Sequence, residues 1–120
     1  MSKILVVDTN GAQLRVTEDI LHAAGFDVLA VPNGSRALAL AIAAAFDYDA
    51  IVTEHLLFCA TGADLASKAR ADGVKIPIVV LSSEHGVEQH YAGLDVRIVY
   101  RPLDSVDLIE ALRPASAVVA

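Results

Sequence analysis

The segment "IVTEHLLFCATG" (residues 51–62) contains the change from a buried strand to a helix, which is the repeating unit of this chain. Its apolar beginning stops at an acid, Glu54, as in a short buried strand that delivers a carboxylate at its end. Further on, Thr61 and Asp64 have the spacing of a helix N-cap and an acid in the first turn. Gly73 is a typical stop signal for that helix. We therefore predict a strand that ends at Glu54 and a helix that follows Thr61.

Four other apolar runs accompany this one, and most of them are rich in Val and Ile without a clean alternation of polar and apolar residues. This pattern is typical of strands that are buried on both faces of a sheet. The predicted strands are residues 3–7, 27–31, 50–53, 76–81 and 96–100.

Helical patterns separate these strands, so the chain alternates strand and helix five times. Such an alternation predicts an α/β fold, a doubly wound (βα)5 parallel sheet with helices on both faces. The stretch after residue 82 carries two glycines and fits a long helix poorly. The predicted helices include residues 11–24, 35–46, 61–72 and 103–112.

The chain has 120 residues, of which 55% are hydrophobic, and this suits one folded domain. We expect the domain to span residues 1–113 and a short tail to span residues 114–120. No apolar run is long enough to cross a membrane, and the N-terminus is too short in apolar residues for a signal peptide.

Charge and cysteine content narrow the class of protein further. The single cysteine, Cys59, excludes an internal disulfide and a cysteine-based metal cluster, so we expect a cytoplasmic protein. The formal charge of −6 and the scattered basic residues argue against nucleic-acid binding, which needs clustered Lys and Arg. We expect partners that are proteins or small molecules.

The carboxyl ends of the predicted strands carry the residues that are capable of chemistry. In an open doubly wound sheet, ligands bind at this edge, beside the switch in strand order. Two acids, a hydroxyl and a guanidinium are expected to meet there, from Asp8, Glu54, Ser82 and Arg101. As an alternative role, Ser82 could hydrogen-bond a neighbouring backbone group. We expect the four histidines at the surface.

Five motifs together resemble the receiver domain of bacterial two-component response regulators (the CheY-like superfamily), over nearly all of residues 3–112. The resemblance implies a flavodoxin-like sheet with the strand order 2-1-3-4-5. The motifs are "KILVVDTN", "AGFDVLAVPNGSRALALA", "FDYDAIVTEHLL…TGADLASKAR", "IPIVVLSS" and "YRPLDSVDLIEAL".

The resemblance also implies roles for the residues at the strand ends. In that family, an Asp after strand 3 accepts a phosphoryl group from a histidine kinase, and an acidic pair after strand 1 holds Mg²⁺. Here Asp8 matches the first acid of the pair, but Thr9 replaces the second. Glu54 takes the phosphoacceptor position, Ser82 fits the signalling hydroxyl, and Arg101 replaces the usual Lys. We therefore expect Mg²⁺ binding to be weak or absent, with Asp8 and Glu54 as the weak candidate ligands.

The switch positions of the family are altered as well. Ser82 is present, but Ile98 stands where the family has a switching aromatic in strand 5, and Tyr100 lies two residues further on. The region between Ser82 and Arg101 is about one helical turn shorter than is usual in receivers. This region belongs to the 4-5-5 face (helix 4, strand 5 and helix 5), so we expect the output surface to be reshaped.

These departures favour an atypical receiver, or pseudo-receiver, that is not an enzyme and acts as a protein-interaction module. The Arg101 guanidinium can donate two parallel hydrogen bonds to the Glu54 carboxylate, so we expect these two side chains within salt-bridge distance or joined by one water. Glu54 is then either a selected mimic of the phosphorylated state or the product of drift. The expected partner is a histidine kinase or a downstream output protein at the 4-5-5 face, and a homodimer is a further possibility.

Two alternative functions stay open from the sequence. The first is a receiver that remains competent for phosphotransfer from a histidine kinase. The second is a flavodoxin-like cofactor binder, for which "DTNGAQ" (residues 8–13) offers one Thr and one Gly and the chain offers no Trp.

Overall fold

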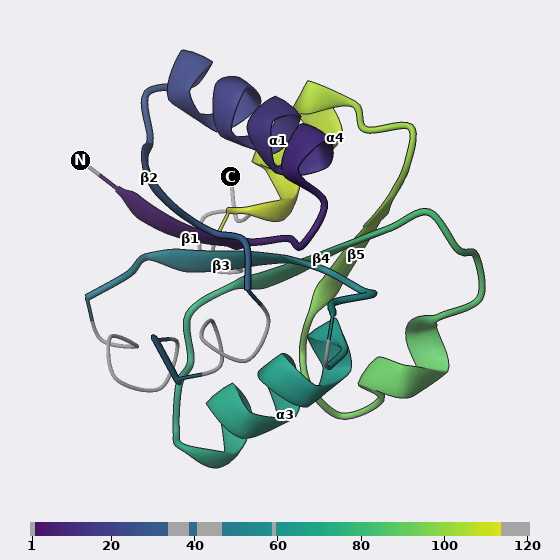
Figure 1. The fold of residues 1–120 in the computed structure, drawn as a ribbon. Helices are drawn as coiled ribbons and strands as arrows, with labels where there is room; N and C mark the ends of the chain where they lie inside the picture. The colour runs from purple at the N-terminus through teal and green to yellow at the C-terminus, as the bar shows by residue number, and fades with distance from the viewer. Residues whose placement is uncertain (1, 34–38, 41–46, 59, 114–120) are drawn as a thin grey trace.

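A computed structural model describes residues 2–33, 39–40, 47–58 and 60–113. Five parallel strands form one sheet in the order β2-β1-β3-β4-β5, which confirms the predicted flavodoxin-like fold (Figure 1). The strands are β1 (Lys3–Val7), β2 (Asp27–Val31), β3 (Ala50–Glu54), β4 (Ile78–Ser82) and β5 (Arg97–Tyr100).

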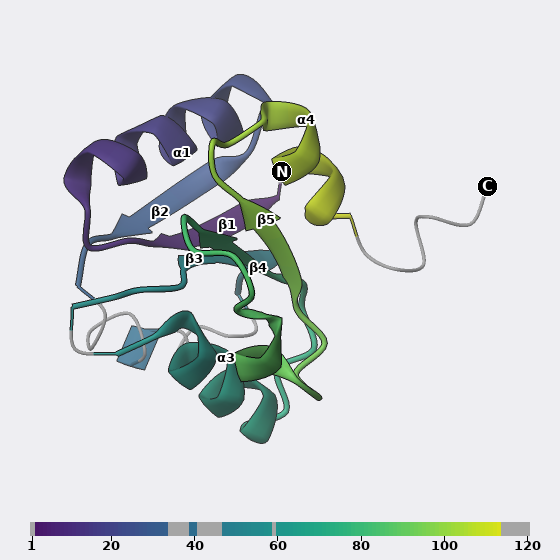
Figure 2. The same ribbon diagram turned by 90° about the vertical axis from the view of Figure 1, so that its right-hand side faces the viewer.

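Helices cover both faces of the sheet. The helices α1 (Gly11–Ala23) and α4 (Ser105–Ala111) lie on one face, and α3 (Gly62–Ala71) lies on the other with the short 3-10 helix η1 (Glu88–Tyr91) (Figures 1 and 2). Most of the predicted helix at residues 35–46 lies outside the described residues, as does the predicted tail at residues 114–120.

Side-chain caps lie at the starts of α1, α3 and α4. Asn10 caps α1 by accepting a hydrogen bond from a backbone N–H of the first turn. Thr61 and Asp64 form a reciprocal capping box at α3, which confirms the N-cap predicted at Thr61. Asp104 caps α4 by accepting hydrogen bonds from the backbone N–H groups of Val106 and Asp107. These caps satisfy backbone donors that a helix cannot pair internally.

The central strands are buried on both faces, as the Val- and Ile-rich runs predict. Alternate residues of β1 point to opposite layers, because successive side chains of a strand alternate. Ile4 packs with Leu21 and Leu108 beneath α1 and α4, whereas Leu5 packs with Leu65 beneath α3. The edge strands β2 and β5 are only partly buried.

The connection from β4 to β5 differs most from a regular strand–helix repeat. It contains only the single turn of η1, flanked by Gly86 (φ +76°) and Gly93 (φ +77°) in the left-handed region. Arg70 of α3 holds the end of this connection, since its guanidinium donates to the carbonyls of Leu94 and Asp95. The fourth strand–helix repeat is therefore incomplete, in agreement with the weak helical pattern of this stretch.

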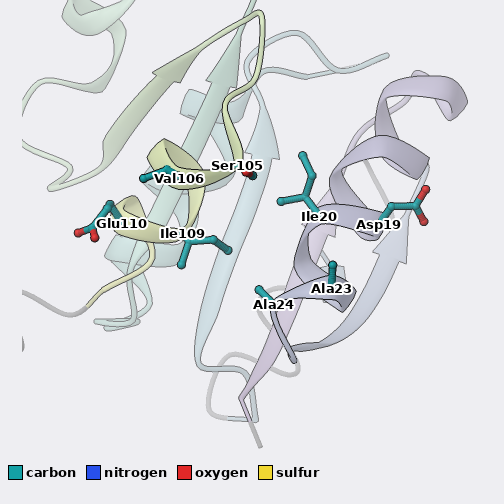
Figure 3. A pocket seen from close by; sticks show the side chains of 8 residues that line it. All are labelled: Asp19, Ile20, Ala23, Ala24, Ser105, Val106, Ile109 and Glu110. Atoms are coloured by element: carbon teal, nitrogen blue, oxygen red, sulfur yellow. The ribbon is translucent and has the colours of Figure 1, made fainter.

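An apolar groove of about 620 Å³ lies between α1 and α4 (Figure 3). Ile20 and Ile109 reach into it from the two helices, while the carboxylates of Asp19 and Glu110 point away. In the described part of the chain, no helix is long and apolar enough to cross a membrane.

Candidate functional site

The strand order brings the predicted site residues together at one edge of the sheet. Asp8 follows β1, Glu54 ends β3, Ser82 ends β4, and Arg101 follows β5. These four strands are neighbours, and the Arg101 backbone N–H donates to the carbonyl of Ser82 over 2.8 Å. Asp8 and Glu54 are only 2% and 7% exposed, so their carboxylates are largely removed from water.

Arg101 is paired with Glu54, which confirms the predicted contact. Its Nε and Nη2 atoms donate to the same carboxylate oxygen, Glu54 Oε2, over 3.2 Å and 2.9 Å. The two donors therefore converge on one oxygen and do not form the pair of parallel bonds expected from the sequence. Glu54 is buried and Arg101 is partly buried, with side-chain exposures of 8% and 12%. A buried pair of this kind fixes the position of both groups.

Asp8 is less well satisfied than Glu54. Its Oδ1 accepts the backbone N–H of Asn10 over 2.9 Å. Its Oδ2 is 3.6 Å from Arg101 Nη2 and has no hydrogen-bond partner among the described residues. Burial raises the pKa of Asp8 and of Glu54, although Arg101 acts in the opposite direction on both. The site thus holds two desolvated carboxylates around one guanidinium.

The hydroxyl of Ser82 forms hydrogen bonds with the backbone two residues further along the chain. Its Oγ donates to the carbonyl of Glu84 over 2.8 Å and accepts the Glu84 N–H over 3.0 Å. This geometry confirms the alternative that Ser82 hydrogen-bonds a neighbouring backbone group.

A cavity of about 220 Å³ lies beside Ser82. The cavity is lined by Asp8, Thr9, Asn10, Gln13, Glu54, His55, Leu56, Ser82, Ser83 and Glu84.

His55 is buried, so the expectation of four surface histidines is wrong at this position. It is 5% exposed, and its Nδ1 is 2.6 Å from the hydroxyl of Tyr91, which is itself buried. The His90 ring lies 5.5 Å from the His55 ring, and burial lowers the pKa of His55. Gly62 makes room for this pair, since a Cβ there would be 2.7 Å from the Tyr91 hydroxyl.

Sequence reasoning missed the His55–Tyr91 pair because its members are far apart in the chain. One signal was available: His55 directly follows a fully buried strand, and it shares a strand face with Thr53. That face points toward α3, so a histidine there is expected to need an internal partner.

The predicted switch positions lie on the face formed by η1, β5 and α4, which we call the output face. Ile98 is half-buried and packs against the core cluster that contains Tyr91. Tyr100 stacks on His85 with ring centroids 4.8 Å apart, and its hydroxyl donates to Glu88. Tyr100 is therefore held at the surface by its neighbours, whereas Tyr91 of η1 places its ring inside the core.

The residues at this edge do not fit a resident Mg²⁺ ion. Arg101 Nη2 is 2.9 Å from Glu54 Oε2 and 3.6 Å from Asp8 Oδ2, so a cation already stands between the two carboxylates. Thr9 adds only a neutral hydroxyl, whereas Mg²⁺ favours carboxylates in near-octahedral geometry. Among the described residues, no three His, Cys, Asp or Glu side chains are grouped so that they could hold a metal ion.

Comparison with known proteins gives a consistent result. The family model of the response regulator receiver domain matches residues 4–113. The protein RcaC of Microchaete diplosiphon is 27% identical over 114 residues, which cover 92% of this chain and 17% of RcaC. This chain therefore spans about one sixth of the length of that relative.

Solved structures show the same similarity. The receiver protein from Sinorhizobium medicae is 32% identical, with a TM-score of 0.80, over 92% of this chain and 90% of that chain. A chain of the CheX–CheY–BeF3–Mg²⁺ complex from Borrelia burgdorferi has a TM-score of 0.82 at 13% identity, over 92% of this chain and 85% of that chain. At such low identity the second similarity shows the fold alone.

Proposed function

The chain belongs to the response regulator receiver domain family, a signalling module of two-component systems and not a classical enzyme, and we propose that its phosphorylation site is degenerate. On this proposal, the domain acts by binding other proteins and does not pass through a phosphorylated state. The observation that carries the proposal is the buried ion pair between Glu54, at the acceptor position, and Arg101.

The pair makes Glu54 a poor phosphoryl acceptor for two reasons. Glu is one methylene longer than Asp, so its oxygens are displaced from the position that suits in-line attack. A displacement of about 1 Å can cost on the order of 100-fold in rate. In addition, Glu54 Oε2 accepts two hydrogen bonds from Arg101, which reduces its nucleophilicity. Glu54 is thus a fixed charge. It was either selected as a mimic of the phosphorylated state or fixed by drift.

The proposal assigns the other site residues supporting roles. Asp8 and Arg101 complete the charge cluster, Thr9 removes the second acid that would hold Mg²⁺, and Ser82 closes a local turn. Asp8 and Glu54 are at most weak metal ligands, because Arg101 lies between them.

Switching by the usual family route has no structural support in the described residues. Ser82 is engaged with Glu84, and Ile98 has no ring to move between buried and exposed positions. Ile is also β-branched and stiff at χ1. A ligand shifts two states only when it distinguishes them. We therefore propose that the output face keeps one conformation.

The proposed partners are proteins. In the structure from Borrelia burgdorferi, CheY forms a complex with the protein CheX. By analogy, this chain would bind a histidine kinase or a downstream output protein through the output face. A second copy of the chain is an alternative partner. The proposal includes a single domain over residues 1–113 and a cytoplasmic location.

We expect beryllofluoride with Mg²⁺ to leave the amide NMR spectrum of the output face unchanged. The reason is that Glu54 stands in place of Asp at the acceptor position, and the site has no second acid beside Asp8 to hold the Mg²⁺ that binds with the phosphoryl analogue. The measurement is a pair of amide spectra, recorded with and without the analogue. Widespread shifts in η1 and β5 would show a working switch and refute the proposal. A triple variant, Thr9→Asp with Glu54→Asp and Arg101→Lys, is the positive control, because it restores the residues of a typical receiver site.

A further inference from the structure

A cavity of about 350 Å³ opens on the output face beside the end of the sheet. Val96 and Ile98 supply an apolar floor, and Tyr100 supplies an aromatic wall. Glu88 and Asp95 line the same cavity, and none of the described residues that line it is basic. Both of these acids are exposed, so their carboxylates are accessible to a partner. A cavity with an apolar floor, an aromatic wall and two acids complements a cation on an apolar stem.

The acids are only partly occupied by their own neighbours. One oxygen of Glu88 accepts the Tyr100 hydroxyl, which leaves its second oxygen as an acceptor. Asp95 lies in the left-handed region at φ +53°, and its backbone carbonyl accepts a hydrogen bond from Arg70. This bond anchors the Asp95 backbone and makes no use of its carboxylate. The two acids are thus fixed in place by bonds that leave carboxylate oxygens for a ligand.

The location of the cavity favours a peptide segment as the source of the cation. β5 is the last strand of the sheet, so one side of its backbone has no strand neighbour in the part of the chain that the structure describes. In Figure 2, β5 faces the viewer between α4 and the α3–η1 layer. An extended segment can lie along such an edge and put alternate side chains into adjacent pockets. Ile98 and Tyr100 line this cavity and also a second one on the α4 side of β5.

We infer that the output face binds a segment of a partner protein that places an arginine side chain in the cavity between Glu88 and Asp95. Arginine fits better than lysine because its planar guanidinium can donate to two carboxylates at once and lie against Tyr100. A second copy of this chain is a poorer occupant, since its net charge of −6 opposes an acidic cavity. The inference rests on the proposed function as a protein-interaction module and names the chemistry of its partner.

The test uses two blocked tripeptides, Ac-Val-Arg-Val-NH2 and its counterpart with citrulline in place of arginine. Citrulline has nearly the same shape but no positive charge. Amide NMR titration of the full chain is expected to show saturable shifts in residues 88–100 with the arginine peptide. We expect binding of the citrulline peptide to be about tenfold weaker, because the charge-assisted hydrogen bonds are lost. A lysine peptide is expected to bind with intermediate affinity.

Variants separate this cavity from general attraction to an acidic protein. Glu88→Gln with Asp95→Asn removes both charges, keeps an acceptor for Tyr100, and keeps a residue that tolerates positive φ at position 95. We expect this variant to lose the preference for arginine over citrulline, and we expect Asp19→Asn, an exposed acid on α1, to retain it. Equal binding of the two peptides, or an arginine preference that survives in the double variant, would overturn the inference. No phosphodonor is present, so either result is independent of the beryllofluoride experiment.

Discussion

Replacing Arg101 with alanine is expected to lower the free energy of unfolding by about 3 to 5 kcal/mol, because it leaves two buried carboxylates without their cation. Asp8 and Glu54 have side chains that are only 3% and 8% exposed, and Arg101 is the cation that contacts both. Urea denaturation at neutral pH measures the effect. The matched control is Arg113→Ala, whose ion pair with Glu110 is 55% and 60% exposed and should contribute less than about 1 kcal/mol.

The loss caused by Arg101→Ala is also expected to depend on pH in a definite direction. Burial already raises the pKa of both carboxyl groups, and Arg101 opposes that rise. Without Arg101 the folded protein binds protons more readily than the unfolded chain, so stability falls as pH rises. The destabilisation should be largest above the folded pKa values and should shrink as pH falls toward the ordinary carboxyl values near 4. A small loss that does not vary with pH would contradict the charge cluster.

Replacing Tyr91 with alanine is expected to destabilise the domain by a comparable amount, about 3 to 5 kcal/mol, because it removes a buried aromatic ring. Tyr91 is 4% exposed and belongs to the core cluster beneath the α3 layer. Its loss removes the main contact between η1 and that core. The measurement is again denaturation, with Phe58→Ala as the control. Phe58 is 84% exposed, so its removal should change stability by less than about 0.5 kcal/mol.

The Tyr91→Phe variant separates the ring from its hydroxyl. It keeps the aromatic packing but leaves His55 Nδ1 without the partner that now lies 2.6 Å away. An unsatisfied buried group costs about 1 to 3 kcal/mol, so this variant should lie between Tyr91→Ala and the wild type. If Tyr91→Phe were as stable as the wild type, the His55–Tyr91 bond would contribute nothing to the stability of the domain.

Local signals in the sequence were sufficient for the sheet and for most of the caps. β1 and β2 have the predicted boundaries, because the apolar run of β1 ends at Asp8 and that of β2 ends at Pro32. β4 begins at Ile78, two residues later than predicted, since Pro77 lacks the N–H that a buried strand needs. β3 ends at Glu54, the acid predicted at the end of its apolar run. The Glu54–Arg101 contact was also predictable, because strand order and charge both point to it.

The remaining features depend on contacts between distant segments, which no local pattern encodes. His55 and Tyr91 are 36 positions apart, and the bond from Arg70 to the carbonyl of Leu94 spans 24 positions. Whether Asp8 Oδ2 has a hydrogen-bond partner depends on the position of the Arg101 guanidinium between the two acids. These details follow only when the side chains are placed in three dimensions.

The central claim is that Glu54 is a fixed charge and does not accept a phosphoryl group. Its most direct test is the intact mass of the protein after incubation with acetyl phosphate and Mg²⁺, with the triple variant Thr9→Asp, Glu54→Asp, Arg101→Lys treated in parallel. We predict that the mass of the wild-type chain stays unchanged, while the variant gains one phosphoryl group. A phosphoryl adduct on the wild-type chain that maps to Glu54 would contradict the account.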